Sequence, residues 1–72
     1  MLIDVRTPDE HRTGHKPGSI NIPLAAIRSF CVPEKNTPIR VYCKSGGRAS
    51  QAKEILESMG YTDVTNIGGF DK

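Results

Sequence analysis

The chain has 72 residues, of which 36% are hydrophobic and 25% charged, so it has room for one small domain of ordinary globular composition. Ten Lys and Arg stand against eight Asp and Glu, and a net charge of +2 is too mild for a nucleic-acid-binding surface. The apolar runs are only a few residues long, which excludes a membrane-spanning helix of about 20 residues. We therefore expect a small folded domain that partners neither nucleic acid nor a membrane.

Two cysteines, Cys31 and Cys43, are too few for the disulfide framework of a small secreted domain. The spacing of Cys and His fits no zinc site, and we expect neither a metal nor a cofactor. A single disulfide between the two cysteines stays open as the alternative to a thiol that is free for chemistry.

The first part of the chain predicts a strand, a short helix and a second strand. Residues 2–6 are rich in aliphatic side chains and end at a turn signal, as a buried strand does. Pro8 and the acidic residues after it are typical of the first turn of a helix, which Gly14 ends. Residues 19–22 then alternate apolar and polar side chains, as a half-buried strand would.

A second short helix is predicted over 24–30, before a polar loop over 32–38. Its spacing places Leu24, Ile27 and Cys31 on one face, so we expect Cys31 to be a small core side chain. The alternative for Cys31 is a resolving thiol that reacts with Cys43.

The second half predicts a strand over 39–42, a helix over 48–59 that Gly60 ends, and a strand over 63–67 that two glycines break. The predicted inner face of this helix consists of Ala49, Ala52, Ile55, Leu56 and Met59. Strands that alternate with helices indicate an α/β fold: a small, mostly parallel sheet of about four strands with helices on both faces.

Cys43 ends the clearest strand and begins a loop that leads into a helix. Ligands of α/β sheets bind at this edge, where unpaired N–H groups favour an anion such as a thiolate. Lys44 and Arg48 add two cations, so we expect a lowered thiol pKa and a nucleophilic sulfur. Gly46 and Gly47 permit the positive φ angles that an inward-curled loop needs. The alternative is a structural Cys before an ordinary glycine turn, which would not need both charges.

The residues Cys43-Lys44-Ser45-Gly46-Gly47-Arg48 resemble the six-residue active-site loop of the rhodanese-like domain family. Further stretches resemble the family in the same order along nearly the whole chain: Ile3–Pro8 with Glu10, Gly14-His15 with Pro17–Pro23, Gly60-Tyr61, and Gly68-Gly69.

The resemblance implies a sulfurtransferase. The Cys43 thiolate would take a sulfur atom from a small anionic donor such as thiosulfate, hold it as a persulfide, and pass it to cyanide or to a thiol, which could belong to a protein. Loop N–H groups would stabilise the persulfide anion, and the cations would hold the sulfonate end of the donor. The residues implied to bind the donor are Lys44, Ser45, Gly46, Gly47 and Arg48.

Asp4 and Arg6 are implied to support the active-site loop through ion pairs, with a plain solvated pair as the alternative. His15 is expected to pack or to bond to the backbone rather than to catalyse. Tyr42, just before the nucleophile, is expected in the core.

Two other functions remain alternatives. A non-catalytic rhodanese-like interaction or sulfur-carrier module would keep the fold without turnover. A cysteine phosphatase or arsenate reductase is disfavoured, because such loops need a longer spacing between Cys and Arg than the four residues from Lys44 to Gly47.

We expect one rhodanese-like domain over residues 1–72, working as a monomer. The family resemblance implies a further strand before residue 4 and a helix after the last glycines, so the domain is expected to be trimmed at both ends. The start of the chain does not resemble a secretion signal, and the lack of a disulfide framework favours the cytoplasm. The periplasm is the alternative, if a signal peptide was removed before Met1.

Overall fold

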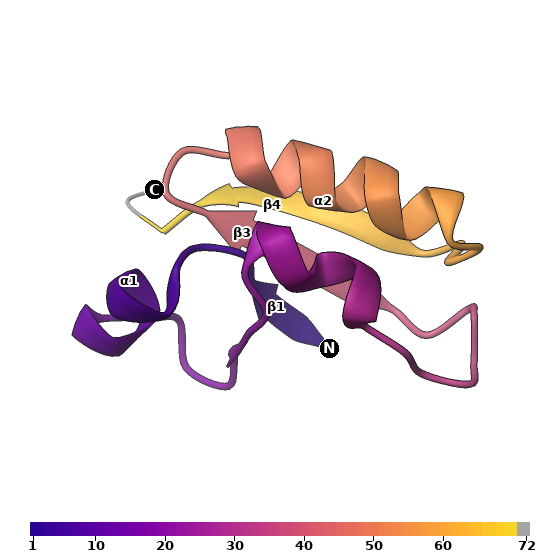
Figure 1. The fold of residues 1–72 in the computed structure, drawn as a ribbon, viewed down its shortest axis with the longest axis horizontal. Coiled ribbons are helices and arrows are strands. Elements are labelled where there is room, and N and C mark those ends of the chain that lie inside the picture. The colour runs from indigo at the N-terminus through magenta and orange to yellow at the C-terminus, as the bar shows by residue number, and fades with distance from the viewer. Residues whose placement is uncertain (71–72) are drawn as a thin grey trace.

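Four parallel strands form a single sheet in the computed structural model, which describes residues 1–70 (Figure 1). The strand order is β2-β1-β3-β4, and a helix lies between each pair of successive strands. The strands are β1 (Leu2–Asp4), β2 (Ile20–Asn21), β3 (Ile39–Cys43) and β4 (Val64–Gly69). This parallel arrangement with intervening helices confirms the predicted α/β fold.

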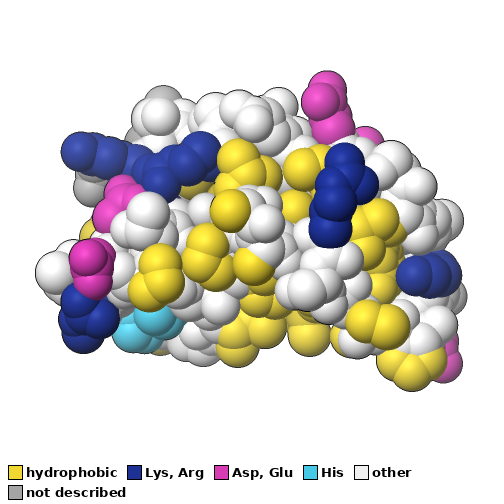
Figure 2. Space-filling model, in the orientation of Figure 1, with side chains coloured by type: hydrophobic (Ala, Val, Ile, Leu, Met, Phe, Trp, Pro, Cys, Tyr) yellow, Lys and Arg dark blue, Asp and Glu magenta, His cyan; other side chains and the backbone are white. Residues whose placement is uncertain are grey.

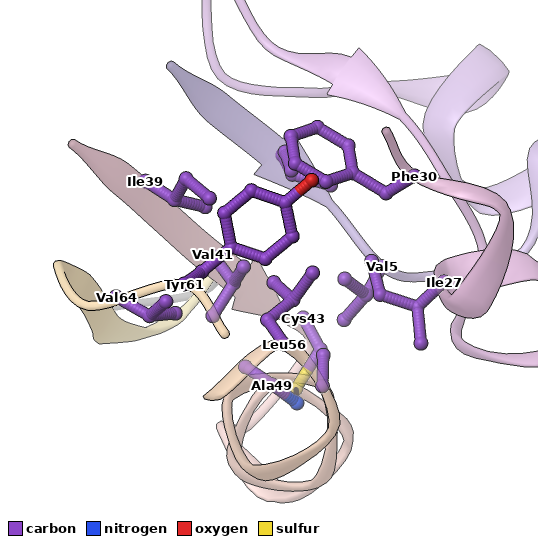
Figure 3. Close-up of a cluster of buried hydrophobic side chains, with 12 residues drawn as sticks. Val5, Ile27, Phe30, Ile39, Val41, Cys43, Ala49, Leu56, Tyr61 and Val64 are labelled. Carbon is purple, nitrogen blue, oxygen red and sulfur yellow. Dashed lines mark hydrogen bonds between the residues drawn. The ribbon is translucent and has the colours of Figure 1, made fainter. Parts of the chain in front are cut away.

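The hydrophobic core lies between one face of the sheet and two helices, η1 (Leu24–Ser29) and α2 (Gly47–Ser58), which contact each other (Figures 1 and 3). Side chains alternate along a strand, so Ile3 of β1 and Val41 of β3 point to this face. The predicted inner face of α2 meets them there. Ala52 and Leu56 are fully buried, as is Ala49, while Ile55 and Met59 pack partly against the core.

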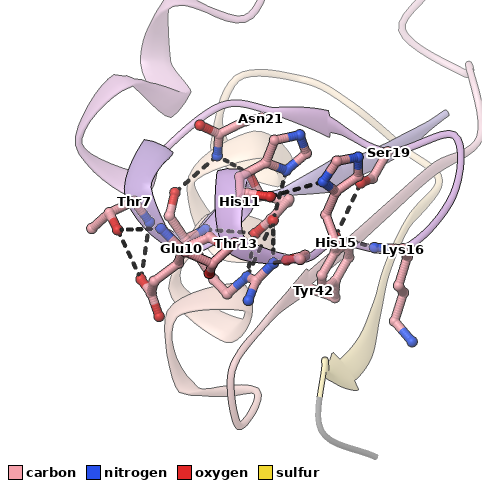
Figure 4. Close-up of polar contacts among 12 residues, drawn as sticks. Thr7, Glu10, His11, Thr13, His15, Lys16, Ser19, Asn21 and Tyr42 are labelled. Carbon is pink, nitrogen blue, oxygen red and sulfur yellow. Dashed lines mark hydrogen bonds and ion pairs between the residues drawn. The ribbon is translucent and has the colours of Figure 1, made fainter.

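Polar contacts cover the opposite face near the carboxyl ends of the strands. The short helix α1 (Pro8–Thr13) has no buried residue, and His11 meets the sheet through the Asp4 carboxylate. Tyr42 is fully buried, as expected, with its hydroxyl bonded to the Lys16 N–H and the Ser19 hydroxyl, both at 3.0 Å (Figure 4). The main apolar cluster therefore lies on one face of the sheet, while Tyr42 is buried among polar groups on the other.

The helix predicted over 24–30 is a 3-10 helix that ends at Ser29, and Cys31 lies beyond it. A 3-10 helix has three residues per turn, which keeps Leu24 and Ile27 on the same side. Ile27 is buried and Leu24 is partly buried, but Cys31 is exposed. The prediction of a core position for Cys31 is therefore wrong, because it assumed the longer period of an α-helix.

The last strand also differs from its prediction, since β4 continues through Gly68 and Gly69 instead of stopping before them. The strand can continue because its pairing with β3 shifts register between Val41 and Cys43, and Gly68 adopts a positive φ of 95° at that irregularity. This register shift brings Gly69 opposite Cys43.

The surface around α2 and η1 mixes apolar and polar side chains, and Lys and Arg gather at the end of the molecule where α2 begins (Figure 2). Within residues 1–70, none of the helices is long and apolar enough to cross a membrane.

Candidate active site

Cys43 is the last residue of β3, and its side chain lies beneath the first turn of α2. The Gly46 N–H donates to Sγ with a nitrogen–sulfur distance of 2.9 Å, and the Ala49 N–H lies at 3.4 Å. Figure 3 shows the sulfur next to Ala49 at the edge of the core. Because Cys43 is only 1% exposed, these backbone donors replace water around the sulfur.

Burial is the largest single influence on the Cys43 thiol, and it raises the pKa. The backbone N–H groups of Ala49, Gly46, Ser45 and Arg48 together outweigh it, and they lower the pKa of Cys43 below its ordinary value. The loop thus favours the thiolate, and it does so mainly with backbone dipoles.

The two glycines of the loop differ in backbone conformation. Gly46 has a φ of 102°, a left-handed conformation that L side chains rarely adopt, and it lets the loop curl under α2. Gly47 begins α2, and a Cβ added there would meet open space. The prediction that both glycines need positive φ angles holds only for Gly46.

Arg48 is held by a carboxylate from another part of the chain. Its Nη1 and Nη2 donate to the two carboxylate oxygens of Glu10 at 2.7 and 3.0 Å. This bidentate pair joins the first turn of α2 to α1. The Arg48 charge is therefore largely balanced by Glu10.

Lys44 and Ser45 are both exposed, next to the buried sulfur. Among residues 1–70, the Lys44 ammonium group has no ion-pair partner. Lys44 is thus the better-placed cation of the loop for an incoming anion.

Glu10 also belongs to the first turn of its own helix. The Thr7 N–H and hydroxyl both donate to Glu10 Oε1 at 3.1 Å, and the Glu10 N–H donates back to the Thr7 hydroxyl (Figure 4). With Arg48 as the largest cause, these bonds lower the pKa of Glu10 from 4.5 to about 2. Glu10 therefore stays charged and bound to Arg48 at any ordinary pH.

The Asp4–Arg6 pair is buried, so the alternative of a solvated pair is wrong. Arg6 Nη2 donates to Asp4 Oδ2 at 2.7 Å, and His11 Nδ1 lies 2.9 Å from the same oxygen. Burial raises the pKa of Asp4, but the hydrogen bonds from Arg6 and His11 together outweigh burial. The pKa of Asp4 is therefore below its ordinary value, and the carboxyl stays ionised.

The contacts of this pair support the sheet and α1 rather than the Cys43 loop. Arg6 Nη2 also donates to the Gly14 carbonyl at 2.6 Å, and its guanidinium lies over the rings of Phe70 and Tyr42. Among residues 1–70, neither Asp4 nor Arg6 hydrogen-bonds to residues 43–48. Support reaches the loop through Tyr42, the residue before the nucleophile, whose ring lies under Arg6, and through α1, whose Glu10 binds Arg48.

The other singled-out residues lie outside this site. His15 stacks on His11 and bonds through Nδ1 to the His11 carbonyl at 2.8 Å, which confirms its expected backbone role. Cys31 and Cys43 are both free, so the alternative of a disulfide is wrong. No group of three or more His, Cys, Asp or Glu within residues 1–70 is placed to hold a metal.

Two residues at the site were missed by the sequence prediction. Glu10 was named as a helix-start acid and in the family resemblance but was given no role at the site, although the Thr7-x-x-Glu10 spacing is itself a capping-box signal. Asn66 donates to the Gly46 carbonyl at 3.1 Å, and no sequence pattern pointed to it.

The model of the rhodanese-like domain family matches residues 1–72. Thiosulfate sulfurtransferase PspE of Escherichia coli is 49% identical over 93% of this chain, and the uncharacterized protein YqhL of Bacillus subtilis is 38% identical over all of it. The chain spans 67% of PspE and 59% of YqhL.

Solved structures agree with this match. A rhodanese with anions from E. coli superposes with a TM-score of 0.88 and 46% identity, covering 97% of this chain and 86% of that one. Human single-domain sulfurtransferase TSTD1 gives a TM-score of 0.85 and 29% identity, covering 94% of this chain and 74% of that one. The chain is a member of the rhodanese-like domain family.

Proposed function

We propose that this chain is a sulfurtransferase that moves a sulfane sulfur from thiosulfate, or a similar small anion, to cyanide or a thiol through a Cys43 persulfide. The observation that carries the proposal is the buried Cys43 sulfur, which accepts N–H groups from Gly46 and Ala49 at the start of α2. A relative named as a thiosulfate sulfurtransferase, 49% identical to this chain, supports the choice of donor.

The first step forms one bond and breaks one. The Cys43 thiolate attacks the outer sulfur of thiosulfate, the sulfur–sulfur bond of the donor breaks, and sulfite leaves with that electron pair. In the second step, cyanide attacks the outer sulfur of the persulfide, and the electron pair of the broken bond returns to Sγ. The two steps regenerate the thiolate and need no other reactant.

The loop has a role in both steps. Backbone N–H groups of Gly46 and Ala49 already face the sulfur, so they can stabilise the thiolate and the persulfide that follows. We assign Lys44 to the sulfonate end of the donor, because it is exposed and no carboxylate within residues 1–70 pairs with it. Arg48 keeps N–H groups that Glu10 does not use, and it completes the binding of the leaving sulfite together with Ser45 and Gly47.

Turnover of thiosulfate and cyanide to thiocyanate tests the proposal. The purified wild-type chain is expected to catalyse this reaction, and Cys43→Ser is expected to abolish it while leaving the circular dichroism spectrum unchanged. Cys31→Ser is the matched control, because that thiol is exposed and lies beyond η1. Full activity in Cys43→Ser, or turnover of p-nitrophenyl phosphate alone, would contradict the proposal.

The setting of the reaction is proposed separately. We propose one domain that acts as a monomer in the cytoplasm, with the periplasm as the alternative compartment. The two free thiols support a reducing compartment. Sedimentation of the purified protein and fractionation of cells test these two points.

A further inference from the structure

The end of β4 forms a bulge that lies directly behind the Cys43 loop. Val41 pairs with Asn66, and the next pair on the same ladder is Cys43 with Gly69, so β4 uses one residue more than β3 over this stretch. Gly68 takes up the extra length with its φ of 95°. The bulge therefore sets the position of the strand end against the loop.

Gly69 leaves the space that the loop backbone occupies. A Cβ at Gly69 would overlap the Lys44 carbonyl oxygen and come within 3.0 Å of the Ser45 Cα. In a trans peptide the C=O and the following N–H point in opposite directions. Because the Lys44 carbonyl points toward Gly69, the Ser45 N–H points away from β4, and it contributes to stabilising the Cys43 thiolate.

Asn66 orients a second peptide of the loop. Its Nδ2 donates to the Gly46 carbonyl at 3.1 Å, and its Oδ1 accepts the Gly68 N–H at 2.8 Å. The Gly46 carbonyl also accepts the Ser50 N–H at 2.9 Å, which is the first bond of α2. By the same rule for a trans peptide, the Gly47 N–H is turned away from Asn66.

One amide thus connects three features of the site: the bulge, the left-handed Gly46 and the start of α2. Both polar groups of the amide are used. One bonds to the Gly46 carbonyl in the loop, and the other bonds to the Gly68 N–H at the bulge, where the strand pairing is interrupted. Without the amide, the Gly46 carbonyl would keep, among the bonds within residues 1–70, the one from the Ser50 N–H. The loop could then rotate about a glycine that has no side chain to restrain it.

We propose that Asn66 is a positioning residue for the Cys43 loop. It holds the peptide between Gly46 and Gly47 so that the N–H groups of the loop face the sulfur and the anionic donor. Asn66 touches neither the sulfur nor the donor in this account, and it acts through Gly46. The inference rests on Cys43 being the nucleophile of the proposed function.

The test is a pH titration of the Cys43 thiolate by its ultraviolet absorbance, in a Cys31→Ser background and with Cys43→Ser as the blank. Asn66→Ala and Asn66→Gln are compared with Asn21→Ala. Asn21 is the matched control, because its amide also bonds to backbone carbonyls, those of Asp4 and Arg6, but these lie outside the loop. Circular dichroism establishes that each protein is folded before titration.

Both Asn66 variants are expected to raise the titration midpoint by about 0.5 to 1 pH unit, as the loss of one stabilising hydrogen bond would. Asn21→Ala is expected to melt at a lower temperature with the midpoint unchanged. If Asn66→Ala does not fold, Asn66→Gln decides alone, since it keeps the amide but displaces it. An unchanged midpoint in the folded Asn66 variants, or an equal shift in Asn21→Ala, would overturn the proposal.

The titration uses no sulfur donor, so it separates this inference from the proposed function. A wild-type protein with no sulfur transfer but a midpoint shift in Asn66→Gln would contradict the function and support the positioning role. Normal sulfur transfer by the wild type with no midpoint shift in Asn66→Gln would support the function and contradict the positioning role.

Discussion

At the scale of single residues, the site depends on backbone groups more than on charged side chains. The sulfur of Cys43 accepts hydrogen bonds from the Gly46 and Ala49 N–H groups, whereas the guanidinium of Arg48 is paired with Glu10. A backbone site of this kind needs close approach, and Gly69 is the position where the structure leaves room for it.

Gly69→Ala is expected to lower the free energy of unfolding by about 2 kcal/mol or more, because the new methyl group overlaps the Lys44 carbonyl and β4 must move. Urea denaturation followed by circular dichroism measures this. The matched control is Gly47→Ala, which places a methyl group in open space at the start of α2 and is expected to change stability by less than about 1 kcal/mol. Equal stability of Gly69→Ala and the wild type would show that the strand end is not constrained by the loop.

At the scale of elements, the contacts that attach α1 to the rest of residues 1–70 are mainly polar. None of its residues is buried, and two pairs connect it to the rest of the fold: Glu10 with Arg48 of α2, and His11 with Asp4 of β1. Polar pairs therefore attach α1 to the fold, whereas apolar packing attaches α2.

Glu10→Gln is expected to lower the free energy of unfolding at neutral pH by about 0.5 to 1 kcal/mol, since the pair is partly exposed. Gln still fits a capping box, so the variant removes the ion pair and retains the cap. The pKa of Glu10 is lower in the folded chain than its ordinary value of 4.5. The stabilisation from its charge is therefore fully present above pH 4.5 and is lost as the pH falls through about 2. The wild-type and variant unfolding curves should therefore converge over this range.

Asp9→Asn is the control for this measurement, because Asp9 lies in the same turn and its partner within residues 1–70 is the exposed Arg12. Its effect at neutral pH is expected to be smaller. A difference between Glu10→Gln and the wild type that is as large at pH 2 as at neutral pH would contradict the assignment of the stabilisation to the charged carboxylate.

At the scale of the whole molecule, a single apolar layer stabilises the fold. The core lies between α2, η1 and one face of the sheet, and the polar cluster around Asp4 occupies the other face. A domain of this size generally has only a few kcal/mol of net stability, so one cavity can exceed the margin.

Leu56→Ala is expected to cost about 2 to 5 kcal/mol, because Leu56 is fully buried where α2 meets the sheet. The variant should be largely unfolded at room temperature by circular dichroism. Ile67→Ala is the comparison, since Ile67 is 43% exposed, and it is expected to stay folded with a change within about 0.5 kcal/mol. A cooperative, wild-type-like melt of Leu56→Ala would contradict a core confined to one layer.

The succession of strands and helices along the chain, and the place of the nucleophile at the end of a strand, could be predicted from the sequence because local signals specify them. The β-branched strands, the stop at Gly60 and the position of Cys43 at a strand-to-helix junction are all local signals, and the structure agrees with them. The predicted stop at Gly68 is wrong, because the pairing of β4 with β3 shifts register there. What sequence could not predict are contacts between distant segments. Glu10 and Arg48 are 38 residues apart, and Asn66 reaches Gly46 over 20 residues.

The central claim is that Cys43 carries sulfur, and mass spectrometry after treatment with thiosulfate tests it most directly. The account predicts that the peptide containing Cys43 gains the mass of one sulfur atom, that cyanide removes the added mass, and that the peptide containing Cys31 is unchanged. A Cys43 peptide whose mass does not change with thiosulfate would contradict the account and favour a non-catalytic interaction module.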